Sequence, residues 1–511
     1  MSAWRARRTA RTQVATPVYA VSMGLFRRLL GAVYVFAFGS LGLEIHGLIG
    51  QHGILPASEY LARAATALGP ARFWRLPTFA WLGAGDRTLH VLCILGVLAG
   101  LLVVLGRVQT LALAAAWSLY LSLSVVGQIF LGYQWDALLL ETGLIAIFLV
   151  PPRLRARHER PVRLSLWLLR WLLFRLMFAS GVVKLSSGDP AWRSLQALRF
   201  HFETQPLPTW IGWWAHQLPA SVATAACVLM FAIELLAPFA VLAPPRWLMV
   251  RRLAAAALLC LQLLIALTGN YGFFNLLSAA LTLCLLDDRC FKRRVASPSP
   301  KQPAQPAPVE RWGRLWRWPA TALAMLALPL GAMQLAAAFR VAVPWPAPLV
   351  ALARRVAPVR SINGYGLFAV MTTARREIVI EGSDDGRHWQ AYLFRDKPSD
   401  PHERPRFIAP HMPRVDWQMW FAALGDVRGN PWFVTFLARL AEAEPTVLAL
   451  LEHDPFAGRA PRLLRARLED WRFTSLSERR TTGDWWQRED AGVYLRPVAC
   501  ARLRALMNGP V

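Results

Sequence analysis

The sequence predicts a multi-pass α-helical membrane protein with about nine transmembrane helices and a C-terminal extracytoplasmic α+β domain that contains a small β-sheet. The composition predicts a membrane protein, because 55% of the 511 residues are hydrophobic, only 17% are charged, and the mean hydropathy is +0.34. Soluble domains carry roughly a quarter charged residues. The chain also contains a series of apolar stretches of membrane-spanning length.

The expected spans follow one another from the N-terminus. The first, in "LLGAVYVFAFGSLGLEIHGLIG", follows Arg27 and Arg28 and is too long for a cleaved signal segment. The remaining spans are expected near 88–106, 110–131, 135–150, 164–183, 221–243, 252–269, 271–287 and 319–340.

These spans divide the chain into four expected parts. They are an N-terminal helical membrane domain at 1–288, with about eight spans and an outer loop at 184–220; a cytoplasmic Pro-rich basic linker at 289–318; a last transmembrane helix at 319–342; and an extracytoplasmic α+β domain at 343–511.

The net charge of +26 is distributed as in a membrane protein, not a nucleic-acid-binding one. Arginines gather in short loops beside apolar segments, as the positive-inside rule requires, and no nucleic-acid-binding motif accompanies them. With the N-terminus inside, all the basic loops fall on one side, and 184–220 and 343–511 fall outside. We expect a bacterial inner-membrane protein with a periplasmic C-terminal domain, or an endoplasmic reticulum protein with a lumenal one if the source is eukaryotic.

The last third of the chain changes character. Residues 377–394 alternate with period two on either side of Asp384-Asp385-Gly386, which predicts a β-hairpin. Apolar residues at helical spacing follow in "DWQMWFAALGD", with Asp416 as the expected N-cap. More helix is expected at 431–453 and 459–470. A domain of about 160 residues is large enough for a core of its own.

Polar side chains at membrane depth are candidates for a site, because a charge there costs at least about 2.5 kcal/mol unless it is paired or reaches water. We expect water to reach Asp136 and Glu141, near one end of their span. The whole group could line a polar cavity or pair structurally, and we favour pairing. Its members are Glu44, His46, Asp136, Glu141, Arg170, Arg175, Glu234 and Gln262.

Lys184 ends an apolar helix in a chain with very few lysines. A desolvated lysine can serve as a base, but it can also snorkel to the interface or pair with an acid, which we favour.

No familiar catalytic or metal-binding motif is present. His201, Glu203 and His216 carry ligand atoms, but the i, i+2 spacing of the first two and the remote third favour a structural role. The six cysteines show neither CxxC spacing nor a disulfide framework. The chain contains no GxSxG, HExxH or P-loop, and no GxGxxG after a strand. We therefore assign no catalytic residue, metal ligand or cofactor, and favour a non-enzymatic role.

Residues 184–208, "KLSSGDPAWRSLQALRFHFETQPLP", form a polar stretch directly after an apolar helix. Asp189 is the expected cap of a short helix that begins at Pro190, and Trp192 is expected to pack its start. We expect this stretch to dock under the C-terminal domain at the membrane boundary. The alternative is that its side chains only satisfy their own loop, through capping and local hydrogen bonds.

Docking predicts ion pairs between the two parts. Arg199 would pair with Asp416 or another acid of the domain. Asp189 and Glu203 would pair with one of four arginines, namely Arg375, Arg376, Arg406 and Arg414.

Six sequence blocks carry a resemblance to a known family. They are "QWDALLLETG", "SGVVKLSSGDPAWRSLQALRFHFETQPLP", "NYGFFN", "SINGYGLFAVMTT", "EIVIEGSDDGRHWQAYLF" and "RFIAPHMPRVDWQMWFAAL". In this order, and followed by "LEHDPFAGRAPRLLRARLEDWRFT", they resemble the signature blocks of the lipase maturation factor family. The resemblance implies a multi-pass membrane protein whose animal relatives reside in the endoplasmic reticulum and help homodimeric lipases reach their active fold. It implies a chaperone-like role without catalytic residues to carry over.

We therefore expect a membrane-anchored maturation or folding factor whose partners are the lipid bilayer and an exported client protein, with a lipase as the candidate. One alternative is an integral membrane enzyme of the vitamin-K-dependent-carboxylase-like helical type, with Glu44, His46, Glu141 and Lys184 lining one pocket for a lipid-side substrate. Another is a structural subunit of an envelope complex. Candidate residues for binding the client or joining the domains are Asp136, Glu141, Lys184, Asp189, Trp192, Arg199, His201, Glu203, Gln205, Asn270, Tyr271, Asn275, Asn363, Tyr365, Arg414, Asp416, Trp417 and Trp420.

Overall fold

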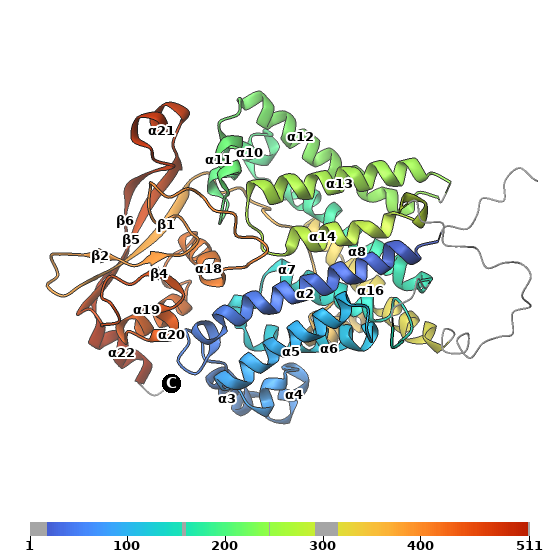
Figure 1. Cartoon of the computed structure of the whole chain (residues 1–511), viewed down its shortest axis with the longest axis horizontal. Coiled ribbons are helices and arrows are strands. Elements are labelled where there is room, and N and C mark those ends of the chain that lie inside the picture. The colour runs from blue at the N-terminus through green and yellow to red at the C-terminus, as the bar shows by residue number, and fades with distance from the viewer. Residues whose placement is uncertain (1–17, 156–159, 245, 292–314, 509–511) are drawn as a thin grey trace, which may run out of the picture.

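A computed structural model describes residues 18–155, 160–244, 246–291 and 315–508. A bundle of helices occupies one end of the long axis, and a smaller domain of strands and short helices occupies the other (Figure 1). The Arg-rich start of the chain and residues 292–314 of the expected linker lie outside the described residues.

The bundle confirms the predicted helical membrane protein. Among the described residues, seven helices are long and apolar enough to cross a membrane. They are α2 (Ala20–Ile49), α5 (Asp86–Val104), α6 (Gln109–Val126), α8 (Arg163–Ser186), α12 (Ala220–Leu236) continued by the 3₁₀ turn Ala237–Leu242, α13 (Leu248–Thr268) and α16 (Arg317–Ala338).

Two of the nine expected spans are shorter than a bilayer. Helix α7 covers Gln134–Ile147 and α14 covers Phe274–Thr282, with a 3₁₀ turn at Leu283–Leu285. At about 1.5 Å per residue, neither reaches across the roughly 30 Å hydrocarbon core. Their apolar residues are instead buried by the surrounding helices, so the hydrophobicity that predicted two spans serves the core of the bundle.

Close helix packing explains the glycines of the first spans. A Cβ on Gly31 of α2 would lie 2.9 Å from the carbonyl oxygen of Gly100 in α5, and a Cβ on Gly100 would meet the carbonyl oxygen of Gly31 at the same distance. A Cβ on Gly96 would lie 2.4 Å from the ring of Phe38. Small residues let membrane helices approach closely where lipid supplies no hydrophobic drive between them.

Short helices cover the end of the bundle that faces the smaller domain. The stretch between α8 and α12 confirms the predicted cap, because Asp189 accepts a hydrogen bond from the Trp192 backbone at 3.1 Å and Pro190 takes the first helical position. The short helices of the bundle and of the connection to the domain are α3 (Ala57–Leu68), α4 (Arg72–Arg75), α9 (Pro190–Arg193), α10 (Ala197–Thr204), α11 (Trp210–His216) and α17 (Ala347–Val356).

A four-stranded antiparallel sheet in the order β2-β1-β5-β6 forms the core of the C-terminal domain. The predicted hairpin is confirmed, since Glu381 of β1 pairs with Ala391 of β2 on either side of the expected turn. A second, two-stranded sheet pairs β3 with β4. The strands are β1 (Arg375–Ser383), β2 (Gln390–Ala391), β3 (Leu393–Phe394), β4 (Leu451–His453), β5 (Leu463–Phe473) and β6 (Trp486–Ala499).

The helix expected at 459–470 is wrong, and so is the end of the one expected at 431–453. Residues 463–473 form β5, the strand between β1 and β6, and 451–453 form β4. The Leu, Ala, Arg and Glu of "LLRARLED" favour a helix locally, but alternate residues bury one face of the strand in the sheet. The helices of the domain are α18 (Arg414–Ala423), α19 (Pro431–Ala441), α20 (Pro445–Leu448), α21 (Leu476–Thr482) and α22 (Cys500–Asn508).

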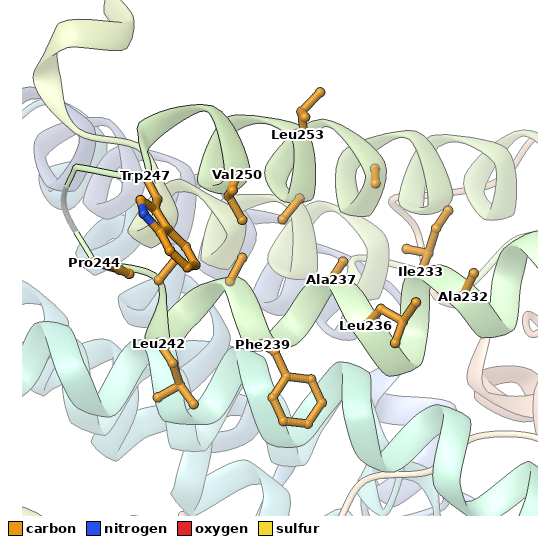
Figure 2. A pocket seen from close by; sticks show the side chains of 14 residues that line it. Ala232, Ile233, Leu236, Ala237, Phe239, Leu242, Pro244, Trp247, Val250 and Leu253 are labelled. Carbon is orange, nitrogen blue, oxygen red and sulfur yellow. The ribbon is translucent and has the colours of Figure 1, made fainter.

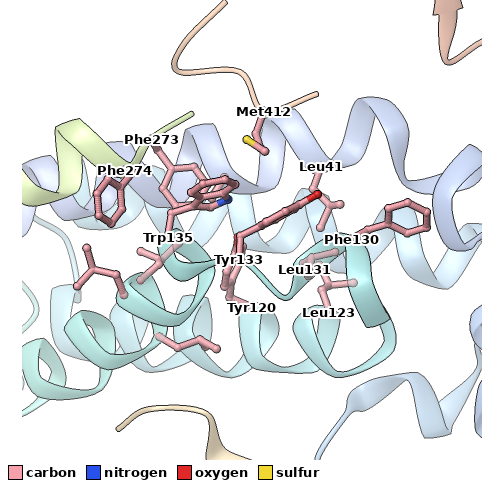
Figure 3. Close-up of a cluster of buried hydrophobic side chains, with 14 of the residues drawn as sticks. Leu41, Tyr120, Leu123, Phe130, Leu131, Tyr133, Trp135, Phe273, Phe274 and Met412 are labelled. Carbon is pink, nitrogen blue, oxygen red and sulfur yellow. The ribbon is translucent and has the colours of Figure 1, made fainter. Parts of the chain in front are cut away.

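An aromatic cluster joins the bundle to the C-terminal region. Figure 3 shows Tyr133 and Trp135, at the start of α7, beside Phe273 and Phe274, with Met412 of the C-terminal region over them. Tyr133 and Trp135 stack with ring centroids 4.6 Å apart. The hydrophobic core therefore runs continuously from the membrane helices into the C-terminal domain.

Candidate functional site: the interface between bundle and domain

The first residue of α18 reaches into the bundle. The guanidinium of Arg414 donates to both carboxylate oxygens of Asp136, at 2.8 and 3.0 Å, and to the Phe130 carbonyl at 2.7 Å. Tyr120 donates to the same carboxylate at 2.5 Å. The side chains of Arg414 and Asp136 are only 1% and 2% exposed, so neither is solvated and each depends on the other for its charge. The expectation that water reaches Asp136 is wrong.

Glu141 is the centre of a second buried cluster, also closed to water. Its carboxylate pairs with Arg175 and accepts hydrogen bonds from the Asn363 backbone at 3.0 Å and the Tyr365 hydroxyl at 2.7 Å. Arg175 also donates to the Asn363 carbonyl at 2.9 Å. The cluster thus ties α7 and α8 to the segment that enters the C-terminal domain.

Gly366, next to Tyr365, takes a backbone path that only glycine adopts easily. Its φ is +152°, its N–H donates to Gln134 at 3.0 Å, and an added Cβ would lie 2.7 Å from the methyl groups of Val183. We expect Gly366→Val to lower the free energy of unfolding by about 3 kcal/mol through overpacking and backbone strain. Gly458→Val is the control, because Gly458 also has a positive φ (+78°) but no neighbour within 4 Å. Equal melting temperatures for the two purified variants would contradict the packing argument.

A third contact places residues 411–414 along α2. Ser40 accepts from the Met412 backbone at 2.8 Å and lies 2.9 Å from Nδ1 of His411. Glu44 accepts from the Arg414 backbone at 2.9 Å, and its other oxygen lies 3.4 Å from Nε2 of His411. Ser40 and Glu44 of α2 therefore hold the C-terminal region.

Titratable groups gather behind this contact. Burial of the ring opposes protonation of His411, but the Glu44 carboxylate and the charge of Asp396 outweigh it, so the pKa of His411 is raised. Burial, with a smaller contribution from Asp396, raises the pKa of Asp416 to about 7. Asp416 lies inside the first turn of α18, after the N-cap Pro413, and not at the N-cap position that the sequence predicted.

These shifts predict that the domain is less stable at higher pH. A raised folded-state pKa contributes stability that is fully present below the unfolded pKa, which is near 4 for an aspartate, and is lost as pH rises through the folded value. For Asp416 the loss falls between about pH 4 and pH 7, and for His411 it has the same sign. Asp416→Asn removes the titration of Asp416, so the melting temperature should fall less between pH 5 and pH 8. Asp470→Asn, at a half-exposed position, should not.

The stretch at residues 184–208 docks against the domain as predicted, but not through the predicted ion pairs. Asp189 accepts from the Met371 backbone at 3.1 Å, and the Trp192 indole donates to the Phe368 carbonyl at 2.9 Å. Glu203 accepts from the Phe473 backbone at 3.1 Å. Backbone N–H groups satisfy these carboxylates, and the arginines that we expected there pair with other acids or with backbone carbonyls.

Arg375 is one of those arginines, and its charge serves the end of α10. It donates to the carbonyls of Glu203 and Pro206 at 2.8 Å each and to that of Gln205, and it pairs with Glu377 at 2.6 Å. The last carbonyls of a helix have no partner within the helix and carry partial negative charge. A buried arginine from β1 therefore caps the end of α10.

The other expected pairings at this surface are also wrong. Arg199 is exposed and donates to Gln196. Asp416 accepts from the backbones of Asp396 and Lys397 at 2.9 and 2.8 Å. The remaining two arginines meet other acids, since Arg376 lies 3.6 Å from Asp470 and Arg406 pairs with Glu403.

Most of the other candidates lie at the same interface. Asn270 donates to the Leu207 and Arg406 carbonyls at 3.1 and 2.9 Å and accepts from the backbone of Ile408 at 2.8 Å. Tyr271 donates to Gln205 at 2.7 Å. Trp420 donates to the Thr204 carbonyl at 2.8 Å, and Trp417 packs on Trp135 with ring centroids 4.7 Å apart.

Three candidates, Lys184, Asn275 and His201, contact residues of the helical bundle. Lys184 pairs with both carboxylate oxygens of Glu234, at 2.9 and 2.8 Å. Pairing with an acid is one of the two roles that we favoured for this lysine. Asn275 donates to Gln262 at 2.9 Å. His201 of α10 lies beside Tyr271, with its Nε2 3.2 Å from the Tyr271 hydroxyl oxygen.

The four groups that an enzyme would need in one pocket do not meet. Lys184 lines a cavity, but Glu44 and Glu141 belong to the separate contacts described above, and His46 stacks with His90 at a ring-centroid distance of 5.3 Å. In the part of the chain that the structure describes, no three His, Cys, Asp or Glu side chains gather to hold a metal ion. The arrangement can hold two parts of the chain together.

Sequence reasoning missed three contributors to the interface. Tyr120 and Ser40 stand in apolar spans without any pattern that marks them. Tyr120 accepts from Arg414 at 3.4 Å and Ser40 from the Met412 backbone, both far along the chain. Lys397 pairs with Glu377 at 3.0 Å behind Arg375, in a chain with few lysines. That rarity was the only signal for it.

Both halves of this architecture match family models. Residues 21–293 match the lipase maturation factor transmembrane domain, and residues 361–496 match the lipase maturation factor C-terminal domain. The chain belongs to the lipase maturation factor family. Lipase maturation factor 2 of Rattus norvegicus is 35% identical over 92% of this chain and 82% of its own length. Lipase maturation factor 1 of Bos taurus is 31% identical over 93% of this chain and 89% of its own length. No solved structure matches the chain.

The match covers both sides of the interface. The lipase maturation factor transmembrane domain contains Asp136, Glu141 and Arg175, and the C-terminal domain contains Asn363 and Arg414. The buried contacts therefore join the two family domains to each other.

Proposed function

We propose that this chain is a membrane-anchored maturation factor for exported proteins, with a lipase as its client. The observation that carries the proposal is that both family domains and more than nine-tenths of the chain align with proteins named lipase maturation factors. The geometry supports it, because the buried polar groups hold a folded domain against the end of a membrane bundle. An assembly of this type can present a surface beside the membrane.

We further propose that this surface is extracytoplasmic and that the domain boundaries are those expected from the sequence. The loops expected in the cytoplasm support it by their contacts at one end of the bundle. The Val108 backbone donates to the Leu154 carbonyl at 2.9 Å, and Asp288 accepts from the backbone of Ala20 at 3.0 Å. The 184–208 stretch contacts the C-terminal domain at the other end.

Reporter fusions test this orientation. Alkaline phosphatase is active only after export, so a fusion after residue 511 should be active and one within the 292–314 segment should be inactive. Green fluorescent protein, which folds poorly after export in an unfolded state, should give the opposite pattern. A fluorescent C-terminal fusion without phosphatase activity would reverse the orientation.

The exposed end of α18 is the surface that we propose for the client. Phe421 and Leu424 lie one turn apart and are 40% and 52% exposed, while Trp417 and Trp420 of the same helix are buried in the interface. Exposed apolar residues beside a rigid support are typical of protein-binding sites. The helix is held at its start by Arg414, so the surface is fixed relative to the helical bundle.

Secretion of an active lipase tests the proposal. A host that lacks the chain is complemented with the wild type or with Phe421→Ser/Leu424→Ser, and lipase activity is measured per mass of secreted enzyme. We expect the wild type to raise this specific activity and the double variant to lose the effect while it still accumulates in the membrane. Leu506→Ser, at an exposed position of α22, is the matched control. Equal specific activity with and without the chain would contradict a role in lipase maturation.

A further inference from the structure

A groove of about 650 Å³ lies between the end of α12, with the 3₁₀ turn that continues it, and the first half of α13. Figure 2 shows Ala237 and Val250 between the two helical segments, and the indole of Trp247 at one end. Leu236 and Leu253 line the groove and are 70% and 65% exposed. In a helix bundle within a bilayer, such exposed apolar side chains face lipid tails. The groove therefore opens toward the lipid.

Short side chains on both segments form the α12–α13 groove. Its lining includes six alanines, namely Ala232, Ala237, Ala240, Ala243, Ala254 and Ala257. Pro238 has no backbone N–H, so α12 gives way to the 3₁₀ turn at this point. Arg251 then fixes the end of the turn, because its Nε donates to the Ala243 carbonyl at 3.0 Å and its Nη1 donates to the Tyr19 hydroxyl at 2.7 Å. Contacts within the protein thus hold the groove in shape.

The α12–α13 groove has the length of one lipid leaflet. On α13 its lining runs from Trp247 to Ala257, which is roughly 15 Å at about 1.5 Å per residue. The hydrocarbon core of a bilayer is roughly 30 Å thick, so the groove covers half of it. Tryptophan is enriched at the boundary between membrane and water, and Trp247 lies at one end of the groove. An acyl chain that begins at Trp247 would end near the middle of the bilayer.

The α12–α13 groove is too narrow for a transmembrane helix. A volume of about 650 Å³ over roughly 15 Å of length gives a cross-section of about 40 Å². A helix with its side chains is about 10–12 Å wide, which corresponds to roughly 80–110 Å². A helix of a second copy or of another protein would therefore lie on the groove without filling it. An acyl chain, which has no backbone and no side chains, can enter.

The end of the groove at Trp247 offers donors to a head group. Arg246, the residue before Trp247, is exposed and has neither an ion pair nor a hydrogen bond to its side chain among the described residues. The indole of Trp247 is 53% exposed and has no hydrogen-bond acceptor in the same part of the chain. Figure 2 shows its nitrogen on the side toward Pro244, at the end of the groove. An arginine and an indole N–H can both donate to a phosphate oxygen.

The acids that follow α14 do not neutralise this end. Asp288 accepts from the backbones of Ala20 and Val21, at 3.0 and 2.9 Å, and so caps the start of α2. Asp287 accepts from Nε of Arg289 at 2.8 Å. Arg246 therefore keeps its charge for an anion at the membrane surface, where each arginine attracts anionic lipids.

We propose that the α12–α13 groove binds one acyl chain of an anionic phospholipid, whose head group pairs with Arg246 and whose phosphate accepts from the indole of Trp247. The chain lies on the alanines between the two segments. The net negative charge of the head group selects the lipid, because the groove itself is apolar and distinguishes no acyl chain from another.

Photolabelling of the purified full-length protein in phosphatidylcholine nanodiscs tests this assignment. The probes are phosphatidylglycerol and phosphatidylcholine with the same diazirine in the acyl chain, and labelled peptides are located by mass spectrometry. We expect phosphatidylglycerol to label residues 232–243 and 247–257 about fivefold more than phosphatidylcholine does, as one arginine beside an anionic lipid predicts. The two probes should label the exposed Leu95 and Leu98 of α5 equally.

Two pairs of variants separate the groove from the general lipid surface. Ala257→Phe fills the deep end of the groove and should abolish the preferential label, whereas Ala256→Phe, at an exposed position outside the lining, should leave it. Arg246→Gln should lower labelling by phosphatidylglycerol to that by phosphatidylcholine. Its control is Arg107→Gln, which removes an exposed arginine between α5 and α6 and should change nothing in the groove.

Three results would overturn the proposal. They are equal labelling of the groove by the two probes in the wild type, an unchanged preference in Ala257→Phe, and no label in the groove at all, as expected if a second copy of the chain covers it. The comparison of probes on the wild type needs no variant, so it decides the question even if a substituted protein fails to fold.

Discussion

Replacing Arg414 with methionine is expected to lower the free energy of unfolding by about 3–5 kcal/mol, because Asp136 would remain charged, buried and unpaired. The Phe130 carbonyl would also lose its donor. The domain should then separate from the bundle before the bundle unfolds. Differential scanning fluorimetry in detergent, together with the rate of trypsin cleavage, measures both effects. The control is Arg406→Met, since the Arg406 side chain is about half exposed and exposed pairs contribute under about 1 kcal/mol.

A double variant distinguishes a lost charge pair from lost packing. Replacing both partners of a buried pair with apolar residues is often neutral or stabilising. Arg414→Met/Asp136→Leu should therefore recover most of the stability that Arg414→Met loses. If the double variant is as unstable as the single one, the hydrogen bonds of Arg414 to other groups, and not its pairing with Asp136, hold α18 in place.

Replacing Glu141 with leucine is the second change with a large expected effect, again about 3–5 kcal/mol. It leaves the Arg175 guanidinium buried without its acid and removes the acceptor of the Asn363 backbone and the Tyr365 hydroxyl. Because those two residues begin the path into the C-terminal domain, cleavage by proteases near residues 340–362 should be faster.

Tyr365→Phe is the matched control for Glu141→Leu. It removes one hydrogen bond to the same carboxylate and leaves the ion pair, so it should cost only about 1 kcal/mol. If the two variants were equally stable, the buried charge of Arg175 would have to be compensated by another group, and the central role of Glu141 would be refuted.

Much of the fold could be predicted because its signals are local. Apolar runs of membrane length predicted the spans, and alternation around Asp384-Asp385-Gly386 predicted the hairpin. The expectations that differ from the structure have one cause, which is that contacts between distant parts of the chain override the local composition. The stretches at α7 and α14 are apolar because other helices bury them, and β5 has a helix-favouring composition that pairing with β1 and β6 overrides.

The candidate residues of the interface were also visible in the sequence, but their partners were not. A carboxylate such as Asp136 in an apolar span must be paired, so its importance follows from the cost of burying a charge. That its partner is Arg414, 278 positions away, depends on the packing of the whole chain. Likewise, Glu203 and Asp189 dock on the domain, but they accept from backbone N–H groups, which carry no sequence identity.

By itself, the sequence determined that this protein lies in a membrane, that a domain with a hairpin follows the last span, and which family it belongs to. Those features depend on composition and on residues close together in the chain. Only the tertiary structure decided which charges meet, that the Arg414–Asp136 pair is closed to water, and that Lys184, Glu234 and His201 line one cavity. Burial and pairing join residues that the chain keeps far apart, so the energy of these contacts exists only after the helices have packed.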